Sequence, residues 1–403
     1  MEYSAQEILQ FVNEEDVKFI RLAFCDVYGK QKNISIMPNE LTRAFSEGIP
    51  FDSSAIAGFG DESHSDLLLH PDPSTLSILP WRPEHGRVVR MFCDITYPDG
   101  RVFERDTRTI LKNAVKEAKK AGITFDFGSE TEFYLFKEDE NGNPTFTPHD
   151  NAGYMDIAPL DKGENVRREI CLTLEQMGIR PESSHHEEGP GQNEIDFRCS
   201  SPLSAADNAM TFQTVVAAIA HRNGLWADFS ARPIENMPGN GFHISIAVKD
   251  ENGNILLPQI IAGLLENISD MTLFLNPTET SYKRFGTNKA PKYISWSSDS
   301  RSQLVRVPVV SGGLSRADLR SPDPMANTYL AFALIIYSCI AAIKKNAVPP
   351  TASDINFFNA TEKELTKYKK LPQSLDEAKS NAKNSEFIKS VLPQSLIDAY
   401  LAI

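Results

Sequence analysis

Acidic side chains on either side of a tight turn are the first feature of this sequence that could do chemistry. Glu187 and Glu194 flank a Gly-Pro-Gly segment, residues 189–191. Glycine lets the backbone fold tightly and proline fixes one φ angle, so the two carboxylates can converge on one point. Hard cations such as Mg²⁺ and Mn²⁺ prefer such clusters of oxygen atoms. A surface hairpin with solvated acids is the alternative that the spacing alone leaves open.

A second pair of acids lies in residues 125–136, where aromatic and aliphatic side chains are typical of a strand. Glu130 and Glu132 are two residues apart, so in a strand they point to the same face. Carboxylates in such an apolar strand are unfavourable unless a cation meets them. His243 follows a glycine-rich turn at the start of another alternating strand. Alone it would be an ordinary strand histidine, but near four glutamates it is a candidate nitrogen ligand.

Composition indicates a globular chain and argues against several partners. The chain has 403 residues, of which 41% are hydrophobic and 24% charged, and its length suits two or three domains. A net charge of −13 argues against nucleic acid or an anionic membrane as the main partner. The five cysteines form no CxxC pair and the N-terminus lacks a signal-peptide pattern, so we expect a cytoplasmic protein. The most apolar run, residues 330–343, is too short to span a bilayer and predicts a buried helix.

Periodicity along the chain predicts an α+β fold. Residues 1–100 indicate a small α/β unit, and the chain then enters a second unit, residues 101–403, in which strands carry the acids. Strands that return directly, without regular βαβ alternation, favour an antiparallel sheet in this second unit. A GxxxxGK[ST] motif is absent from the sequence, so any ATP must be held by metals and side chains. The patterns predict helices at residues 5–13, 163–177, 204–223 and 258–273, and strands at residues 17–24 and 88–95.

Six motifs together resemble a known family, the bacterial type I glutamine synthetases. They occur in the family's order and at about its spacings: FDFGSETEFYLF, HHEEGPGQNEI, PGNGFH, NPTETSYKRF, RSQLVRVP and RADLRSPDPMANTYL. The resemblance implies an N-terminal β-grasp-like domain, residues 1–100, that lends a loop to the neighbouring subunit's site. It also implies a large catalytic domain, residues 101–403, with an antiparallel sheet flanked by helices and a C-terminus shorter than the family's.

The activity implied by the resemblance is an ATP-dependent ligase. Such an enzyme joins the γ-carboxylate of glutamate to ammonia or an amine through a γ-glutamyl phosphate, within a homo-oligomer built as a hexameric ring or stacked rings. Phosphoryl transfer needs metal ions at the phosphates and cations that meet the charge of the moving group. The implied cofactors are therefore Mg²⁺ or Mn²⁺, two or more per site, with ATP as co-substrate.

Family positions imply a role for each candidate residue. Guanidinium groups suit phosphate and carboxylate because their planar fork binds both bidentately. One metal site matches Glu132, Glu187 and Glu194, and a second matches Glu130, His243 and Asp318, where the family usually has glutamate. ATP contacts match Arg301, Arg306, Arg316 and Ser245, and glutamate contacts match Arg284, Arg320 and Gly239. The candidate catalytic residues are Arg301 at the transferred phosphate, Asp52 from the neighbouring subunit, Tyr154 beside the ammonium pocket, and Lys289.

Lys289 is the departure that matters most. It stands where the family's flap carries a glutamate that helps to take the ammonium proton. A cation there would repel ammonium and cannot act as an anionic base. Three functions therefore stay open: a ligase for ammonia, a ligase for another amine whose anionic group Lys289 accepts, and a non-catalytic homologue that binds ATP or glutamate. Cys199 also replaces a common aromatic stacking residue, and Phe358 replaces the tyrosine that is adenylylated in some enterobacterial members.

Overall fold

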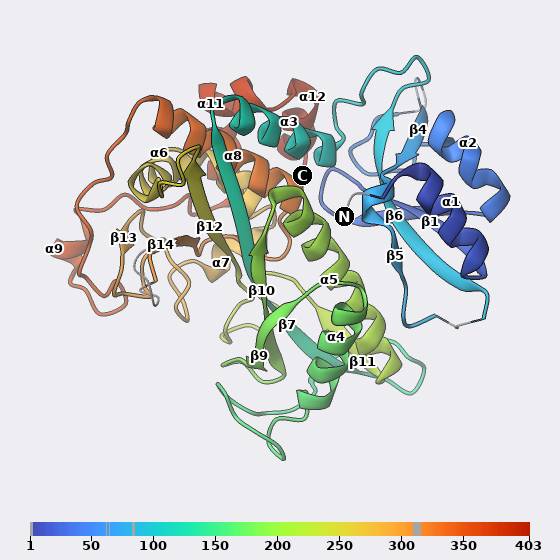
Figure 1. The fold of residues 1–403 in the computed structure, drawn as a ribbon. Coiled ribbons are helices and arrows are strands. Elements are labelled where there is room, and N and C mark those ends of the chain that lie inside the picture. Colours follow the sequence, from blue (N-terminus) through green and yellow to red (C-terminus); the bar gives the residue numbers. More distant parts are fainter. Residues whose placement is uncertain (1–2, 62, 64, 83–84, 309–315) are drawn as a thin grey trace.

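Two β-sheets form the frame of this chain in a computed structural model (Figure 1). The structure describes residues 3–61, 63, 65–82, 85–308 and 316–403. The smaller sheet belongs to the N-terminal part, drawn in blue on the right of Figure 1, and the larger sheet lies in the remainder of the chain. The predicted α+β class is confirmed. Among the residues described, none of the helices is both long enough and apolar enough to cross a membrane.

The smaller sheet has six strands in the order β2-β1-β6-β4-β3, with β5 paired to β6. Its central pair, β1 and β6, is parallel, and the other pairs are antiparallel. Helix α1 contributes Ile8 and Val12 to the buried core. The elements are α1 (Ala5–Glu14), β1 (Val17–Cys25), β2 (Gln31–Ile36), α2 (Leu41–Ser46), β3 (Ile49–Asp52), β4 (Asp66–Pro71), β5 (Ser77–Ile78) and β6 (Arg87–Thr96).

The larger sheet has nine strands, and the long strand β7 lies near its middle. The order is β13-β14-β15-β12-β7-β10-β9, with β8 and β11 also paired to β7. The predicted antiparallel arrangement holds except between the short edge strands β13 and β14, which are parallel. The strands are β7 (Ile123–Glu138), β8 (Pro144–Pro148), β9 (Pro181–His186), β10 (Gln192–Ser200), β11 (Leu225–Asp228), β12 (Phe242–Asp250), β13 (Trp296–Ser297), β14 (Val305–Arg306) and β15 (Ala317–Leu319).

Helices contribute the apolar side of this larger sheet. Helix α8 is buried along most of its length, which confirms the predicted buried helix, and its Phe332 stacks on Phe127 of β7 with ring centroids 4.3 Å apart. Since side chains alternate along β7, Glu130 and Glu132 belong to the opposite face from Phe127. The helices are α3 (Thr107–Lys120), α4 (Glu164–Gln176), α5 (Pro202–Arg222), α6 (Leu257–Leu275), α7 (Glu279–Arg284), α8 (Thr328–Lys344), α9 (Glu362–Leu365), α10 (Leu375–Asn384), α11 (Glu386–Val391) and α12 (Gln394–Leu401).

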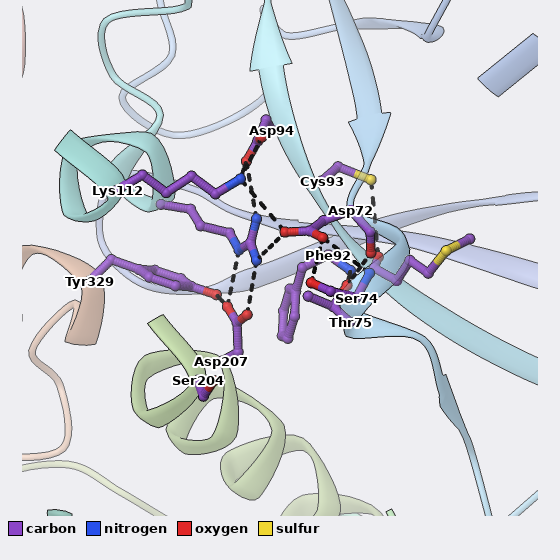
Figure 2. A network of polar contacts seen from close by, with 12 residues as sticks. Asp72, Ser74, Thr75, Phe92, Cys93, Asp94, Lys112, Ser204, Asp207 and Tyr329 are labelled. Carbon is purple, nitrogen blue, oxygen red and sulfur yellow. Dashed lines mark hydrogen bonds and ion pairs between the residues drawn. The ribbon is translucent and has the colours of Figure 1, made fainter. Parts of the chain in front are cut away.

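A network of charged groups joins the N-terminal sheet to the helices (Figure 2). Arg108 of α3 forms ion pairs with Asp72 at 2.9 Å, Asp94 at 3.0 Å and Asp207 at 3.0 Å. Asp94 belongs to β6 and Asp207 to α5, and the Tyr329 hydroxyl of α8 donates to Asp207 at 2.7 Å. One buried guanidinium therefore connects four segments that are distant in sequence.

Candidate active site

Strand register brings the predicted acids together on one face of the larger sheet. Antiparallel pairing places Glu194 of β10 opposite Glu132 of β7. Pairing on the other side of β7 places His243 of β12 opposite Glu130. Because directly opposite residues share a face of the sheet, three distant segments supply their side chains to one surface. The same register continues through Ser245, which is opposite Asp318 of β15.

The turn between β9 and β10 has the geometry that its glycines predict. Gly191 adopts a φ of +69°, in the left-handed region that favours glycine. At Gly189, an added Cβ atom would lie 2.0 Å from the Tyr134 hydroxyl, so a side chain has no room there. The turn leaves Glu194 only 6% exposed. The alternative of a solvated surface hairpin is therefore wrong.

One cavity of about 250 Å³ collects most of the predicted site residues. Its lining includes every predicted metal ligand and all the predicted glutamate contacts, together with Tyr154, Lys289, Arg301 and Arg306. Ser245 and Arg316 line an adjacent cavity that shares Glu130 with the first. The full set in the first cavity is Glu130, Glu132, Tyr154, His185, Glu187, Glu188, Gln192, Glu194, Pro238, Gly239, His243, Arg284, Asn288, Lys289, Ala290, Arg301, Arg306, Asp318 and Arg320.

Asp52 is the one predicted site residue that lies apart from both cavities. It ends β3 in the N-terminal sheet, where its carboxylate accepts a hydrogen bond from the Ser54 amide at 2.9 Å. The structure contains a single chain, so the predicted contribution of Asp52 to a neighbouring subunit's site stays a prediction.

Burial and mutual repulsion act on several of the acids that line the cavity. Burial, reinforced by the charge of Glu132, raises the pKa of Glu194 well above its ordinary value. Burial also raises the pKa of Glu132 and of Asp318. Glu130 differs: burial would raise its pKa, but its contact with His243 Nδ1 at 3.1 Å, together with the charges of Arg316 and Arg320, outweighs burial and lowers the pKa to about 2. A cation bound among these acids would relieve their mutual repulsion, and carboxylate and imidazole donors fit Mg²⁺ or Mn²⁺.

Two tight groups of donor atoms stand out among these side chains. His185, Glu187 and Glu194 form one, and Glu130, Glu194 and Asp196 form the other, with the donor atoms of each group within 4.8 Å of one another. His185 and Asp196 were not predicted from the sequence. Both can be recognised as candidate ligands once the strand register is known, because His185 is paired opposite Glu194 and Asp196 opposite Glu130.

The remaining predicted ligands have protein partners. Glu132 accepts from the Gly241 amide at 2.8 Å. Asp318 accepts from the Ser245 hydroxyl at 2.7 Å and lies 3.8 Å from Arg306 and 3.4 Å from Arg316. The division of the ligands into two metal sites therefore stays a prediction.

Buried arginines supply positive charge on the other side of the cavity. Arg284 and Arg320 are 3% and 7% exposed, and within the described ranges neither forms an ion pair. Within the described residues their hydrogen bonds go to backbone carbonyls, such as that of Ser321, which accepts from Arg284 at 2.8 Å. Burial lowers the pKa of Arg320 to about 10. Because a guanidinium has five N–H donors, both arginines keep donors for an anionic ligand.

Lys289 reaches the cavity from a turn in which it and Asn288 both have positive φ, at +67° and +43°. Its ammonium group forms an ion pair with Glu188 and lies 5.2 Å from the centre of the Tyr154 ring. Glu188 was not predicted as a site residue from the sequence. The predicted lysine is therefore in place, but a carboxylate balances its charge.

Comparisons with known proteins agree with this geometry. Residues 16–98 match the model of the family described as glutamine synthetase, beta-Grasp domain, and residues 104–403 match glutamine synthetase, catalytic domain. The chain is 42% identical to a glutamine synthetase from Clostridium saccharobutylicum, over 99% of this chain and 94% of that one. It is also 42% identical to a glutamine synthetase from Methanosarcina mazei, over 98% and 92% of the two chains. A solved structure described as a GmaS/ADP complex superposes with a TM-score of 0.89 at 26% identity, covering 100% of this chain and 94% of that one.

Proposed function

The chain belongs to the glutamine synthetase family and is an ATP-dependent glutamate ligase, and we propose that it activates and ligates glutamate in the cavity around Glu130 and Glu194. There the γ-carboxylate becomes a γ-glutamyl phosphate, which ammonia or a small amine then attacks. The observation that carries this proposal is the meeting, in one cavity, of buried acids whose pKa is raised and of two buried arginines that form no ion pair within the described residues.

In this proposal, arginines bind the glutamate substrate. Arg284 and Arg320 keep free donors, so their guanidinium groups hold the substrate carboxylates, and Gly239 lines the cavity beside Arg284, where an added Cβ atom would lie 3.1 Å from that side chain. Arg301 and Arg306 meet the charge of the transferred phosphoryl group, a task that suits preorganised cations. Arg316 and Ser245, in the adjacent cavity, contact the nucleotide.

The acids hold the metal ions. Donor chemistry favours Mg²⁺ or Mn²⁺, with Glu132, Glu187 and Glu194 as one ligand set and Glu130, His243 and Asp318 as the other. When bound, such ions neutralise the charge that builds up on the phosphates during transfer. The protein's own contribution is to keep the carboxylates on one sheet face, at a distance set by strand register.

An amine other than ammonia is the second candidate acceptor. Lys289 favours it, because a cation at the flap position could bind an anionic group on a larger amine. The ion pair between Lys289 and Glu188 instead favours ammonia as the acceptor, because the two side chains together carry no net charge that would repel ammonium. The two candidates differ in one measurable respect, the acceptor that sustains turnover.

Assembly and location complete the proposal. The active protein is a cytoplasmic homo-oligomer, with units at residues 1–100 and 101–403, in which Asp52 and its loop reach the site of a neighbouring subunit and Tyr154 lies at the ammonium pocket. An exposed apolar segment next to the cavity supports a covering neighbour: Met155, Ile157 and Leu160 are 58%, 77% and 60% exposed. A monomer should then be inactive.

A phosphate-release screen tests the proposal. Protein with ATP, glutamate and Mg²⁺ or Mn²⁺ is offered ammonium and a panel of primary amines. We expect glutamate-dependent phosphate release that at least one acceptor accelerates. If binding of ATP or glutamate is detected but no acceptor and neither metal produces turnover, the chain is a non-catalytic homologue and the proposal is wrong.

A further inference from the structure

Resting on this proposed function, we infer that Glu188 is the acceptor-binding carboxylate of the site. It receives the ammonium group of the incoming amine, and Lys289 is the partner that the amine displaces. Glu188 thereby supplies the negative charge that the flap position, occupied by Lys289, lacks.

Glu188 differs from the other acids of the cavity because it has no proposed metal to bind. The acids that line it are Glu130, Glu132, Glu187, Glu188, Glu194 and Asp318. All except Glu188 belong to the proposed metal ligands, whose charge the metal ions and arginines offset. Glu188 is therefore the lining carboxylate that is left to meet a monovalent cation.

The side chains of Glu187 and Glu188 point in different directions. Glu187 turns toward His185, whose Nε2 atom lies 3.0 Å from the Glu187 carboxylate. Glu188 instead contacts Lys289, which lies over the ring of Tyr154. The face of an aromatic ring attracts ammonium groups as well as a lysine. The place now taken by the lysine ammonium group therefore has the surroundings that an ammonium ion needs, a carboxylate and a ring face.

The Lys289 side chain can leave Glu188 without disturbing bound glutamate. The side chains of Lys289 and Glu188 are 52% and 31% exposed, and ion pairs in contact with water contribute little to stability. The Lys289 carbonyl, in contrast, accepts from Arg320 at 3.3 Å, which fixes the turn independently of the side chain. A competing cation can therefore take Glu188 while the backbone remains on the glutamate-binding arginine.

Substitutions at the pair make the inference testable with two nucleophiles. Ammonium is a cation at pH 7.5, whereas hydroxylamine is largely uncharged and reports the γ-glutamyl phosphate as a hydroxamate. Glu188→Gln should lower kcat/KM for ammonium at least about tenfold, the scale of a hydrogen bond to a charged group. The same variant should leave hydroxamate formation within about twofold, since that nucleophile needs no carboxylate partner.

Lys289→Met should act in the opposite direction, because it removes the competitor for Glu188 and lowers the KM for ammonium. The double variant should behave like Glu188→Gln alone, since the lysine matters only through the carboxylate. Glu266→Gln is the matched control: it breaks a surface pair with Lys345 at 2.8 Å and should change neither reaction.

The outcomes separate this inference from the proposed function. Unchanged ammonium kinetics in Glu188→Gln overturn the inference, and so does an equal loss with both nucleophiles, which would indicate a structural role. If the unsubstituted protein forms product with neither nucleophile, the ligase assignment of this cavity fails instead.

Discussion

Two groups of carboxylates in this chain lie in opposite electrostatic surroundings. At the junction with the N-terminal sheet, Asp72, Asp94 and Asp207 lie close together (Figure 2) and all three form ion pairs with Arg108. Arg108 is 3% exposed. Burial alone would raise the pKa of Asp72, but the charge and hydrogen bond of Arg108, together with Ser74 and Lys112, outweigh burial and lower it. In the cavity, burial raises the pKa of Glu194, and within the described part of the chain Glu194 forms no ion pair with a lysine or arginine.

This difference in surroundings distinguishes acids with a structural role from acids with a functional role. Buried charges that are paired within the chain hold segments together, and removing one partner leaves the others uncompensated. Buried acids that repel one another reduce the stability of the fold, so they indicate a ligand that arrives later. The following predictions test this distinction, beginning with the largest expected effect.

Removal of the shared cation should unfold the junction. Arg108→Met removes the ion-pair partner of the buried Asp207, whereas Asp72 and Asp94 keep Lys112, and breaking a buried pair in this way costs about 3–5 kcal/mol. Urea denaturation measures this loss of unfolding free energy. Arg101→Met is the matched control, because Arg101 pairs with Asp99 at an exposed position and its loss should cost at most about 1 kcal/mol. Equal effects of the two substitutions would contradict the structural role of the junction.

Removal of a cavity acid should instead weaken metal binding. Glu187→Gln keeps the shape of the side chain but removes a charge from one of the two tight donor groups. We expect Mn²⁺ affinity to fall by at least about 10–100-fold, the range seen when even outer-shell partners of a metal are removed. Isothermal titration calorimetry measures the affinity. An unchanged dissociation constant would remove Glu187 from the ligand set.

Glu194→Gln should stabilise the protein when metal is absent. The folded-state pKa of Glu194 is raised above its ordinary value of 4.5, so its stabilising contribution is fully present below pH 4.5 and is lost as pH rises through the folded pKa. Glutamine does not titrate and avoids that loss. With chelator at neutral pH, the variant should therefore have the higher unfolding midpoint, and with Mn²⁺ the order should reverse. A lower midpoint in chelator would show that Glu194 is not under electrostatic repulsion.

The smallest expected effect lies at the flap position. Lys289→Glu replaces the cation beside Glu188 with a carboxylate, so ammonium should be used more readily, by a few-fold, about the scale of a single exposed charge contact. Initial rates over a range of ammonium concentrations measure the change. An unchanged rate in a normally folded variant would show that the charge at this position does not affect the acceptor.

Much of this arrangement was predictable from local patterns. Alternation along residues 125–136 identified the strand and put Glu130 and Glu132 on one face, and the Gly-Pro-Gly segment identified the turn after Glu187. What escaped prediction depends on which strands pair and in what register. His185, Asp196 and Glu188 are ordinary polar residues until β9, β10 and the turn at Lys289 are placed side by side.

The ion pairs at the junction and the role of Asp52 depend in the same way on contacts between distant segments. The structural role of Arg108 becomes apparent only when the three segments that carry its aspartate partners are placed around it. The parallel pairing of β1 with β6 likewise joins strands separated by most of the N-terminal sheet. The role predicted for Asp52 requires a second chain, which no pattern within one chain can position.

Counting bound Mn²⁺ by electron paramagnetic resonance tests the central claim most directly, because the claim is that the cavity acids exist to hold divalent ions. Metal-free protein at neutral pH is titrated with Mn²⁺, alone and as the Glu132→Gln/Glu194→Gln double variant. The account predicts more than one tightly bound ion per chain, and the loss of at least one of them in the variant. Absence of tight binding, or the same number of bound ions in both proteins, would contradict it.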